Sequence, residues 1–210
     1  GAKIAGRPVY DTTSTGVPVL TGYTSEPPVT RGNQNTIVIN NNITTTGSGI
    51  AISSLAGSSA TNTGSTAQGF TITNNRIVQP SGGFPTYGIY CSGFNIATGA
   101  GLIANNTVSA QISATSSYYG IYPYQSKNVN IYHNTVTMTG GSATGGRPLY
   151  VNNLSTGFPA TGVNIQNNIF ENNGLGYVAE VSTVSALGTI TDLGNNVYFG
   201  SGTNPFRYNA

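Results

Sequence analysis

Charged side chains are scarce in this sequence. Only 6% of the 210 residues are Asp, Glu, Lys or Arg, whereas a globular domain usually has about 25%. The seven basic residues are spread singly, so there is no basic stripe that would bind nucleic-acid phosphates. No apolar run reaches the roughly 18 residues of a membrane-spanning helix. We therefore expect neither a nucleic-acid partner nor direct insertion into a membrane.

The residue types that most often bind metals or carry redox chemistry are nearly missing. Cys91 is the single cysteine and His133 the single histidine, so no intrachain disulfide can form and no pair of imidazoles can bind zinc. The residues beside Cys91 match no metal-binding or redox spacing, and we expect a buried structural thiol. The sequence predicts no metal site and no cofactor.

Aromatic and turn-forming residues are abundant instead. A weakly charged chain with few aromatic residues would be expected to be disordered, but this one has 13 Tyr and 7 Phe. The 29 Gly, together with many Asn, Thr and Ser, indicate frequent tight turns. A chain of 210 residues is long enough to bury one continuous core. These features predict a folded, turn-rich, all-β domain.

One short phrase recurs along the chain. Residues 72–77 read ITNNRI, and this is one of six phrases that share an apolar or aromatic residue three positions before and two positions after their second Asn. These second Asn residues are Asn41, Asn75, Asn106, Asn134, Asn168 and Asn196. They are 28 to 34 residues apart, a near-regular period that is typical of a solenoid. The flanking residues alternate with the period of two expected of strands.

The Asn-Asn pair has a physical explanation. Asn tolerates the left-handed backbone region, so the pair suits a sharp corner between two short strands. If corners stack about 4.8 Å apart, each Asn amide can hydrogen-bond to its equivalents above and below. The six second Asn residues are therefore predicted to form a structural ladder. His133 stands where the other phrases have their first Asn, so we interpret it as a polar corner residue rather than as a catalytic base.

A second, weaker repeat lies between these corners. Residues 88–91 (GIYC) and 120–123 (GIYP) are predicted to be equivalent strands. The matching inward column is expected to contain Ile50, Ile89, Ile121, Leu149 and Val178. Tyr90, Tyr122 and Tyr150 would then point outward as candidate ligand-binding residues, because outward rings could stack against sugar rings. The alternative is that these rings cover the sheet or a docked loop.

The repeated phrases resemble the right-handed parallel β-helix, or pectin-lyase-like, repeats of large secreted or cell-surface proteins of Bacteroidetes-type bacteria. Residues 32–37 (GNQNTI) and 167–172 (NNIFEN) carry this resemblance. It implies an all-β, right-handed parallel β-helix (solenoid) of about six to seven coils. We expect a single domain over residues 1–210, with an irregular or incomplete first coil in 1–30 and regular coils in 31–200.

The resemblance also implies where the protein acts. Such proteins are secreted, here by the type nine route, so the expected localisation is extracellular or at the cell surface.

The sequence shows no amphipathic segment at either end that would form a capping helix, and an uncapped solenoid exposes a strand edge. We therefore expect the chain to be a fragment of a longer multidomain protein, with neighbouring domains as its partners. Residues 11–13 (DTT) resemble a bacterial O-glycosylation acceptor, which makes Thr12 a candidate glycan site.

Catalytic candidates follow from the same resemblance. Polysaccharide lyases on this fold gather carboxylates around calcium, and glycosidases use a carboxylate pair. Glu171, Glu180 and Asp192 fall on adjacent predicted C-terminal coils, so they are the catalytic candidates of this chain. Single solvated carboxylates are the alternative interpretation.

The leading hypothesis is a non-catalytic structural or adhesive β-helix module of a secreted or cell-surface bacterial protein. The alternatives are a carbohydrate-active enzyme (polysaccharide lyase or glycoside hydrolase) and a carbohydrate-binding platform built on the tyrosine column. Polysaccharide and secretion-machinery proteins are further candidate partners. The lack of clustered carboxylates in the sequence favours the first hypothesis over an enzyme.

Overall fold

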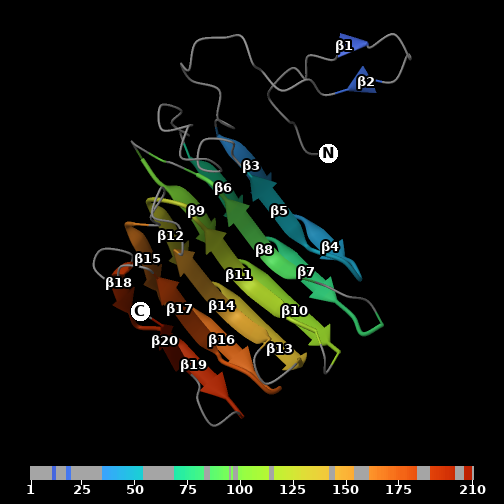
Figure 1. Ribbon diagram of the computed structural model, residues 1–210, viewed down its shortest axis with the longest axis vertical. Coiled ribbons are helices and arrows are strands. Elements are labelled where there is room, and N and C mark those ends of the chain that lie inside the picture. The colour runs from blue at the N-terminus through green and yellow to red at the C-terminus, as the bar shows by residue number, and fades with distance from the viewer. Residues whose placement is uncertain are drawn as a thin grey trace.

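The chain folds into an all-β parallel solenoid, which confirms the predicted fold class (Figure 1). The computed structural model describes residues 11–12, 18–19, 35–53, 69–82, 86–94, 96, 99–113, 116–141, 145–153, 161–183, 190–201 and 206–209. These residues form three six-stranded parallel sheets and contain no helix. Each coil contributes one strand to each sheet, so neighbouring strands in a sheet come from successive coils.

The three sheets are named here in the order in which one coil passes through them. Sheet 1 consists of β3 (Thr36–Ile39), β6 (Phe70–Thr73), β9 (Gly101–Ala104), β12 (Val129–Tyr132), β15 (Val163–Gln166) and β18 (Ile190–Gly194). Sheet 2 consists of β4 (Asn42–Thr44), β7 (Arg76–Gln79), β10 (Thr107–Ile112), β13 (Thr135–Gly140), β16 (Ile169–Asn172) and β19 (Val197–Gly200). Sheet 3 consists of β5 (Ile50–Ser53), β8 (Tyr87–Ser92), β11 (Tyr118–Tyr124), β14 (Gly146–Asn153), β17 (Ala179–Thr183) and β20 (Phe206–Asn209).

The enclosed part of the solenoid is shorter than the predicted six to seven coils. Each sheet has six strands, and only the four inner ones have a neighbour on both sides, so about four turns are fully stacked. The short strands β1 (Asp11–Thr12) and β2 (Pro18–Val19) pair with each other in antiparallel fashion, apart from the three sheets. The rest of the predicted first coil (1–30) and the side chain of Thr12 lie outside the described residues. The handedness implied by the resemblance stays a prediction.

The apolar residues that flank each Asn pair form the core, because the parallel register places them in columns. The column before the corner is Val38, Ile72, Ile103, Ile131, Ile165 and Leu193. The column after it is Ile43, Ile77, Val108, Val136, Phe170 and Tyr198. The members from the four inner coils are completely buried. Burial of these stacked side chains is the main source of stability for the fold.

The third inward column differs from the prediction at one position. Ile50, Ile89, Ile121 and Leu149 are in register, but Leu149 pairs with Ala179 and not with Val178. Val178 and Ala179 are both buried, so hydrophobicity alone could not separate the two registers. Because side chains alternate along a strand, this shift by one residue turns Glu180 to the outer face, in register with Tyr150.

The corner prediction is confirmed by the backbone. The residue at the first Asn position has a φ angle between 53° and 59° in all six phrases: Asn40, Asn74, Asn105, His133, Asn167 and Asn195. This left-handed conformation is strained for most residues and tolerated by Asn. His133 adopts it with its side chain exposed, as expected of a polar corner residue. Cys91 is fully buried, and burial raises the pKa of its thiol, so it is the expected structural cysteine.

Candidate binding face of the third sheet

The second Asn residues form a continuous hydrogen-bonded column. Asn75 Nδ2 donates to Asn106 Oδ1 at 3.0 Å, and Asn106 Nδ2 donates to Asn134 Oδ1 at 2.9 Å. The backbone N–H of each Asn donates to the same oxygen of the next coil, as in the 3.0 Å bond from Asn75. The pattern runs from Asn41 through Asn168 to Asn196. The polar groups of the column therefore satisfy one another inside the protein, which gives it a structural role.

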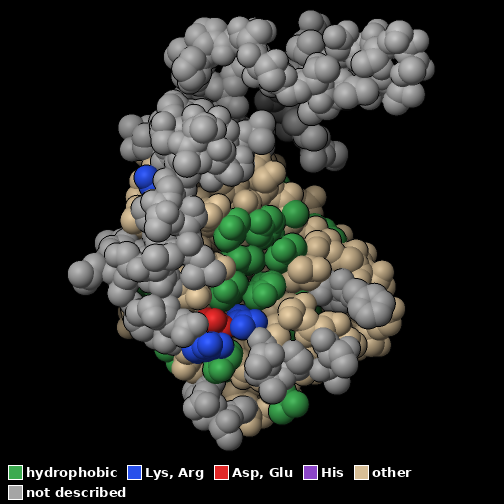
Figure 2. Space-filling model, in the orientation of Figure 1, with side chains coloured by type: hydrophobic (Ala, Val, Ile, Leu, Met, Phe, Trp, Pro, Cys, Tyr) green, Lys and Arg blue, Asp and Glu red, His purple; other side chains and the backbone are tan. Residues whose placement is uncertain are grey.

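The outer face of sheet 3 carries a cluster of tyrosines. The tyrosine face consists of Tyr87, Tyr90, Tyr119, Tyr122, Tyr124 and Tyr150, which come from β8, β11 and β14 and contact one another through their rings. Figure 2 shows hydrophobic side chains, tyrosine among them, gathered on one face of the solenoid. Basic and acidic side chains lie together at one end of this patch.

A glycine explains how two tyrosines three positions apart reach the same face. Gly88 and Ile89 separate Tyr87 from Tyr90, and both are buried. A Cβ atom at Gly88 would lie 2.5 Å from the backbone oxygen of Gly120 and 2.7 Å from the Val108 side chain. Only a residue without a side chain fits there. Two successive residues can therefore face the core, which leaves a tyrosine on the outside before and after them.

The rings of the tyrosine face stand against one another. Tyr87 and Tyr90 are stacked with ring centroids 4.4 Å apart and an interplanar angle of 18°, and Tyr119 stacks on Tyr150 at 4.9 Å. Tyr122 and Tyr150 are only 8% and 9% exposed, so their rings mainly cover the sheet. Tyr87, Tyr90, Tyr119 and Tyr124 are half-buried. These four rings, with their edges and hydroxyl groups, are the accessible part of the face.

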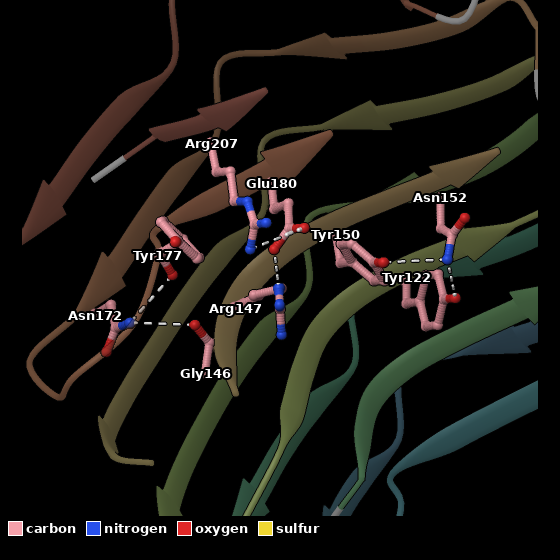
Figure 3. A network of polar contacts seen from close by, with 9 residues as sticks. All are labelled: Tyr122, Gly146, Arg147, Tyr150, Asn152, Asn172, Tyr177, Glu180 and Arg207. Carbon is pink, nitrogen blue, oxygen red and sulfur yellow. Dashed lines mark hydrogen bonds and ion pairs between the residues drawn. The ribbon is translucent and has the colours of Figure 1, made fainter. Parts of the chain in front are cut away.

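The two most buried rings share a polar partner. Asn152 Nδ2 donates to the hydroxyl oxygens of Tyr122 at 3.2 Å and of Tyr150 at 3.1 Å (Figure 3). Burial raises the pKa of Tyr122 and of Tyr150, and the nearby Glu180 carboxylate raises that of Tyr150 further. Burial and the neighbouring tyrosines also raise the pKa of Tyr87. All three phenols are therefore protonated at neutral pH and keep a hydroxyl group for hydrogen bonding.

An arginine–glutamate cluster closes one end of the tyrosine face. Glu180 lies between Arg147 and Arg207 (Figure 3). Arg147 Nε donates to Glu180 Oε2, and Arg207 Nη1 lies 3.9 Å from Glu180 Oε1. The Arg147 guanidinium also lies 5.1 Å from the ring centroid of Tyr150 and 5.4 Å from that of Tyr119. Glu180 is 3% exposed, so the two arginines compensate for removing its carboxylate from water. The aromatic rings attract the Arg147 cation.

The three carboxylates proposed as catalytic candidates do not share a face. Glu171 belongs to sheet 2 and accepts a hydrogen bond from Asn173 at 2.6 Å. Asp192 belongs to sheet 1 and accepts one from Gln166, whereas Glu180 belongs to sheet 3. The part of the chain that the structure describes holds no group of three His, Cys, Asp or Glu residues that could bind a metal ion. It also holds no helix with the length and apolar composition needed to cross a membrane.

The sequence prediction found half of the tyrosine face. Tyr90, Tyr122 and Tyr150 lie on it in adjacent coils, whereas Tyr87, Tyr119 and Tyr124 were missed. The repeated spacing of Tyr87 to Tyr90 and of Tyr119 to Tyr122 was the available signal. It could not be read as a shared face, because a strand with a strict period of two places residues three apart on opposite sides.

No family model, no curated protein and no solved structure matches this chain.

Proposed function

We propose that this chain is a non-catalytic, adhesive β-solenoid module of a secreted or cell-surface bacterial protein, and that the tyrosine face is its adhesive surface. The observation that carries the proposal is the cluster of half-buried tyrosines on one parallel sheet. Tyrosine combines a large apolar ring with a hydroxyl group and is enriched at binding surfaces. Polysaccharide is the proposed ligand class, since its apolar ring faces and hydroxyl groups match both parts of the side chain.

The rigidity of the face supports this role. The strands below the tyrosines are held by parallel hydrogen bonding to both neighbours in sheet 3, and Asn152 fixes the two central hydroxyl groups. A surface whose side chains are already ordered loses little conformational entropy when it binds. The described carboxylates are spread over three sheets, which favours adhesion over hydrolysis for the described surface.

Retention on a polysaccharide column tests the proposal. The wild-type protein should be delayed on resins that carry immobilised bacterial or plant polysaccharides, relative to the bare resin. A Tyr87→Ala, Tyr90→Ala double variant should lose this delay, because both side chains are half-buried members of the face. Tyr132→Ala is the matched control, since Tyr132 is also half-buried but belongs to β12 of sheet 1.

Two outcomes would contradict the adhesive role of the tyrosine face. Equal retention of the wild type and the double variant would mean that another surface binds the polysaccharide. Passage of the wild type through every polysaccharide resin without delay would leave the module as a spacer that does not adhere through this face.

The proposed location at the cell surface has its own test. Antibody raised against the chain should stain intact cells that have not been permeabilised.

A further inference from the structure

The outer face of sheet 3 changes from aromatic to charged along the solenoid axis. Two rows of side chains cross its strands in register. One row is Tyr87, Tyr119 and Arg147, and the other row ends in Tyr150, Glu180 and Arg207. Each row begins with tyrosine and ends with arginine. A ligand that lies along a row therefore passes from aromatic rings to a guanidinium group.

The charged end of this face has more positive than negative charge. Arg147, Glu180 and Arg207 are the only charged residues in the described strands of sheet 3, so two cations meet one carboxylate. Glu180 is buried, whereas the Arg207 side chain is 35% exposed. This end of the face therefore presents net positive charge to the solvent.

Arg147 also has hydrogen-bond donors that the protein does not use. A guanidinium group has five N–H donors, and only the Nε atom of Arg147 donates to Glu180. Figure 3 shows the rest of the guanidinium directed away from the Glu180 carboxylate. Within the described part of the chain, its Nη atoms have no hydrogen-bond partner. They are not closed off from solvent, because the Tyr198 hydroxyl oxygen is the single buried side-chain polar atom without a partner among the described residues.

We infer that the polysaccharide bound by the tyrosine face is anionic, and that Arg147 and Arg207 bind its negatively charged groups. The inference rests on the proposed adhesive function and specifies its ligand. Carboxylates and sulfate esters both match a guanidinium, whose planar set of donors makes charge-assisted hydrogen bonds to pairs of oxygen atoms. The tyrosine rings hold the sugar backbone, and the arginines select chains that carry charge.

This site does not depend on what precedes or follows the described coils. A further coil would place its strand beside β20, at about 4.8 Å, and not over the outer face of sheet 3. Arg147 lies on β14, which has a neighbouring strand on both sides. The outer face therefore keeps its rows of tyrosine and arginine in a longer solenoid.

Three polymers with the same backbone test the inference. Carboxymethylcellulose carries carboxylates, cellulose sulfate carries sulfate esters, and hydroxyethylcellulose is neutral. Each polymer is immobilised on a sensor surface, and the affinity of the wild type is measured. Binding to at least one charged polymer should be tighter than binding to the neutral one by about tenfold. The charged polymer that binds more tightly identifies the group, carboxylate or sulfate, that the arginines recognise.

Two single charge variants should change this binding in opposite directions. Arg207→Gln should weaken binding to the preferred charged polymer by about threefold, because it removes a partly exposed cation. Glu180→Gln should strengthen binding by about the same factor, because it removes the carboxylate that lies between the two arginines. A purely structural ion pair would not give opposite effects. Circular dichroism checks that both variants retain their β structure.

A double variant isolates the contribution of Arg147. Arg147→Gln combined with Glu180→Gln removes one charge of each sign, so the net charge of the chain stays the same. The Nη donors of Arg147 are lost. Binding to the preferred charged polymer should therefore fall by about tenfold relative to Glu180→Gln alone.

The matched controls change the same charges on another sheet. Arg76→Gln and Glu171→Gln alter the net charge of the chain as Arg207→Gln and Glu180→Gln do, but both residues belong to sheet 2. Neither control should change the affinity for the charged polymers. Effects as large as those of the sheet 3 variants would mean that net charge alone governs binding, which would overturn the inference.

The failure of this inference can be told apart from failure of the proposed function. Equal binding of the wild type to all three polymers would overturn the anionic ligand. If the Tyr87→Ala, Tyr90→Ala variant lost that equal binding, the adhesive role of the tyrosine face would still stand. A preference for charged polymers that none of the sheet 3 variants changed would also overturn the inference. Binding to none of the three polymers would overturn it as well, and the polysaccharide columns would then decide separately on the adhesive role.

Discussion

The asparagine column and the tyrosine face are both stacks of one residue type, but they differ in how the stack is completed. Each inner Asn is buried and makes the same hydrogen bonds to the coils on both sides. The tyrosines have no such uniform pattern, because their rings meet at interplanar angles from 18° to 59°. The Asn column depends on exact repetition of one geometry, whereas the tyrosine face depends on irregular packing of large rings.

This difference separates residues that stabilise the fold from residues of the proposed binding face. A substitution in a buried polar column destabilises the fold when it leaves a hydrogen-bonding group without a partner. A half-buried ring on an outer face can be exchanged with much smaller consequences for folding. We therefore expect changes near the Asn column to affect the free energy of unfolding, and changes at the edge of the tyrosine face to affect binding.

The largest effect is expected in the core beside the Asn column. Ile131 is fully buried, and its backbone oxygen accepts a hydrogen bond from Asn168. Ile131→Asp would place an unpaired carboxylate among stacked apolar side chains, which costs more than the total stability of most domains. The variant should lack a cooperative thermal transition in circular dichroism. A variant that still unfolds cooperatively would contradict the register described for this column.

Replacing one inner member of the Asn column should have the next largest effect. Asn134 Oδ1 accepts two hydrogen bonds from Asn106, and its Nδ2 group donates to Ile103 O and Tyr132 O. Asn134→Ala leaves several of these groups buried without partners, so the free energy of unfolding should fall by about 3 kcal/mol. Asn41→Ala is the matched control at the exposed end of the column and should cost about 1 kcal/mol or less. Equal losses in chemical denaturation would contradict the role of burial.

A somewhat smaller effect is expected where the tyrosine face meets charge. Glu180→Gln keeps the volume of the side chain but leaves Arg147 without its anionic partner. Breaking a fully buried ion pair costs about 3–5 kcal/mol. Here Arg147 keeps its aromatic contacts, so the free energy of unfolding should fall by about 2 kcal/mol. Urea denaturation measures this loss, and a variant as stable as the wild type would mean that the pair does not stabilise the fold.

The smallest effects are expected within the tyrosine face itself. Tyr122→Phe removes the hydroxyl group that accepts a hydrogen bond from the buried Asn152, so the free energy of unfolding should fall by about 1 kcal/mol. Tyr87→Phe removes a hydroxyl group from a half-buried ring and should change that free energy by less than about 0.5 kcal/mol. Chemical denaturation of the two variants measures both losses. A larger loss for Tyr87→Phe than for Tyr122→Phe would contradict the anchoring of Tyr122 by Asn152.

Much of the fold could be predicted because every coil contains the same Asn-containing phrase with apolar flanks. The phrase around Asn75 recurs around Asn106 and Asn134 with the same apolar flanks, and each copy adopts the same corner with a left-handed first residue. A repeated local geometry that stacks at a constant spacing leaves little freedom in the register. The corner role of His133 followed for the same reason.

The tyrosine face could be predicted only in part. Tyr119 lies on it because Gly120 and Ile121 both turn toward the core, and that local departure from alternation depends on how closely the neighbouring coil approaches. Glu180 reaches the face through a shift of one residue that the equally apolar Val178 and Ala179 concealed. Neither feature has a signal in the pattern of apolar and polar residues.

The amino-acid sequence by itself determined the coil, because the spacing of Asn pairs and apolar flanks specifies corners, inward columns and an all-β solenoid. The tertiary structure alone decided which side chains meet across coils. It brought Arg147, Glu180 and Arg207 together from three successive strands of sheet 3, and it kept Glu171, Glu180 and Asp192 on separate sheets. The physical reason is that these meetings depend on strand register, where a shift of one residue moves a side chain from the core to the surface.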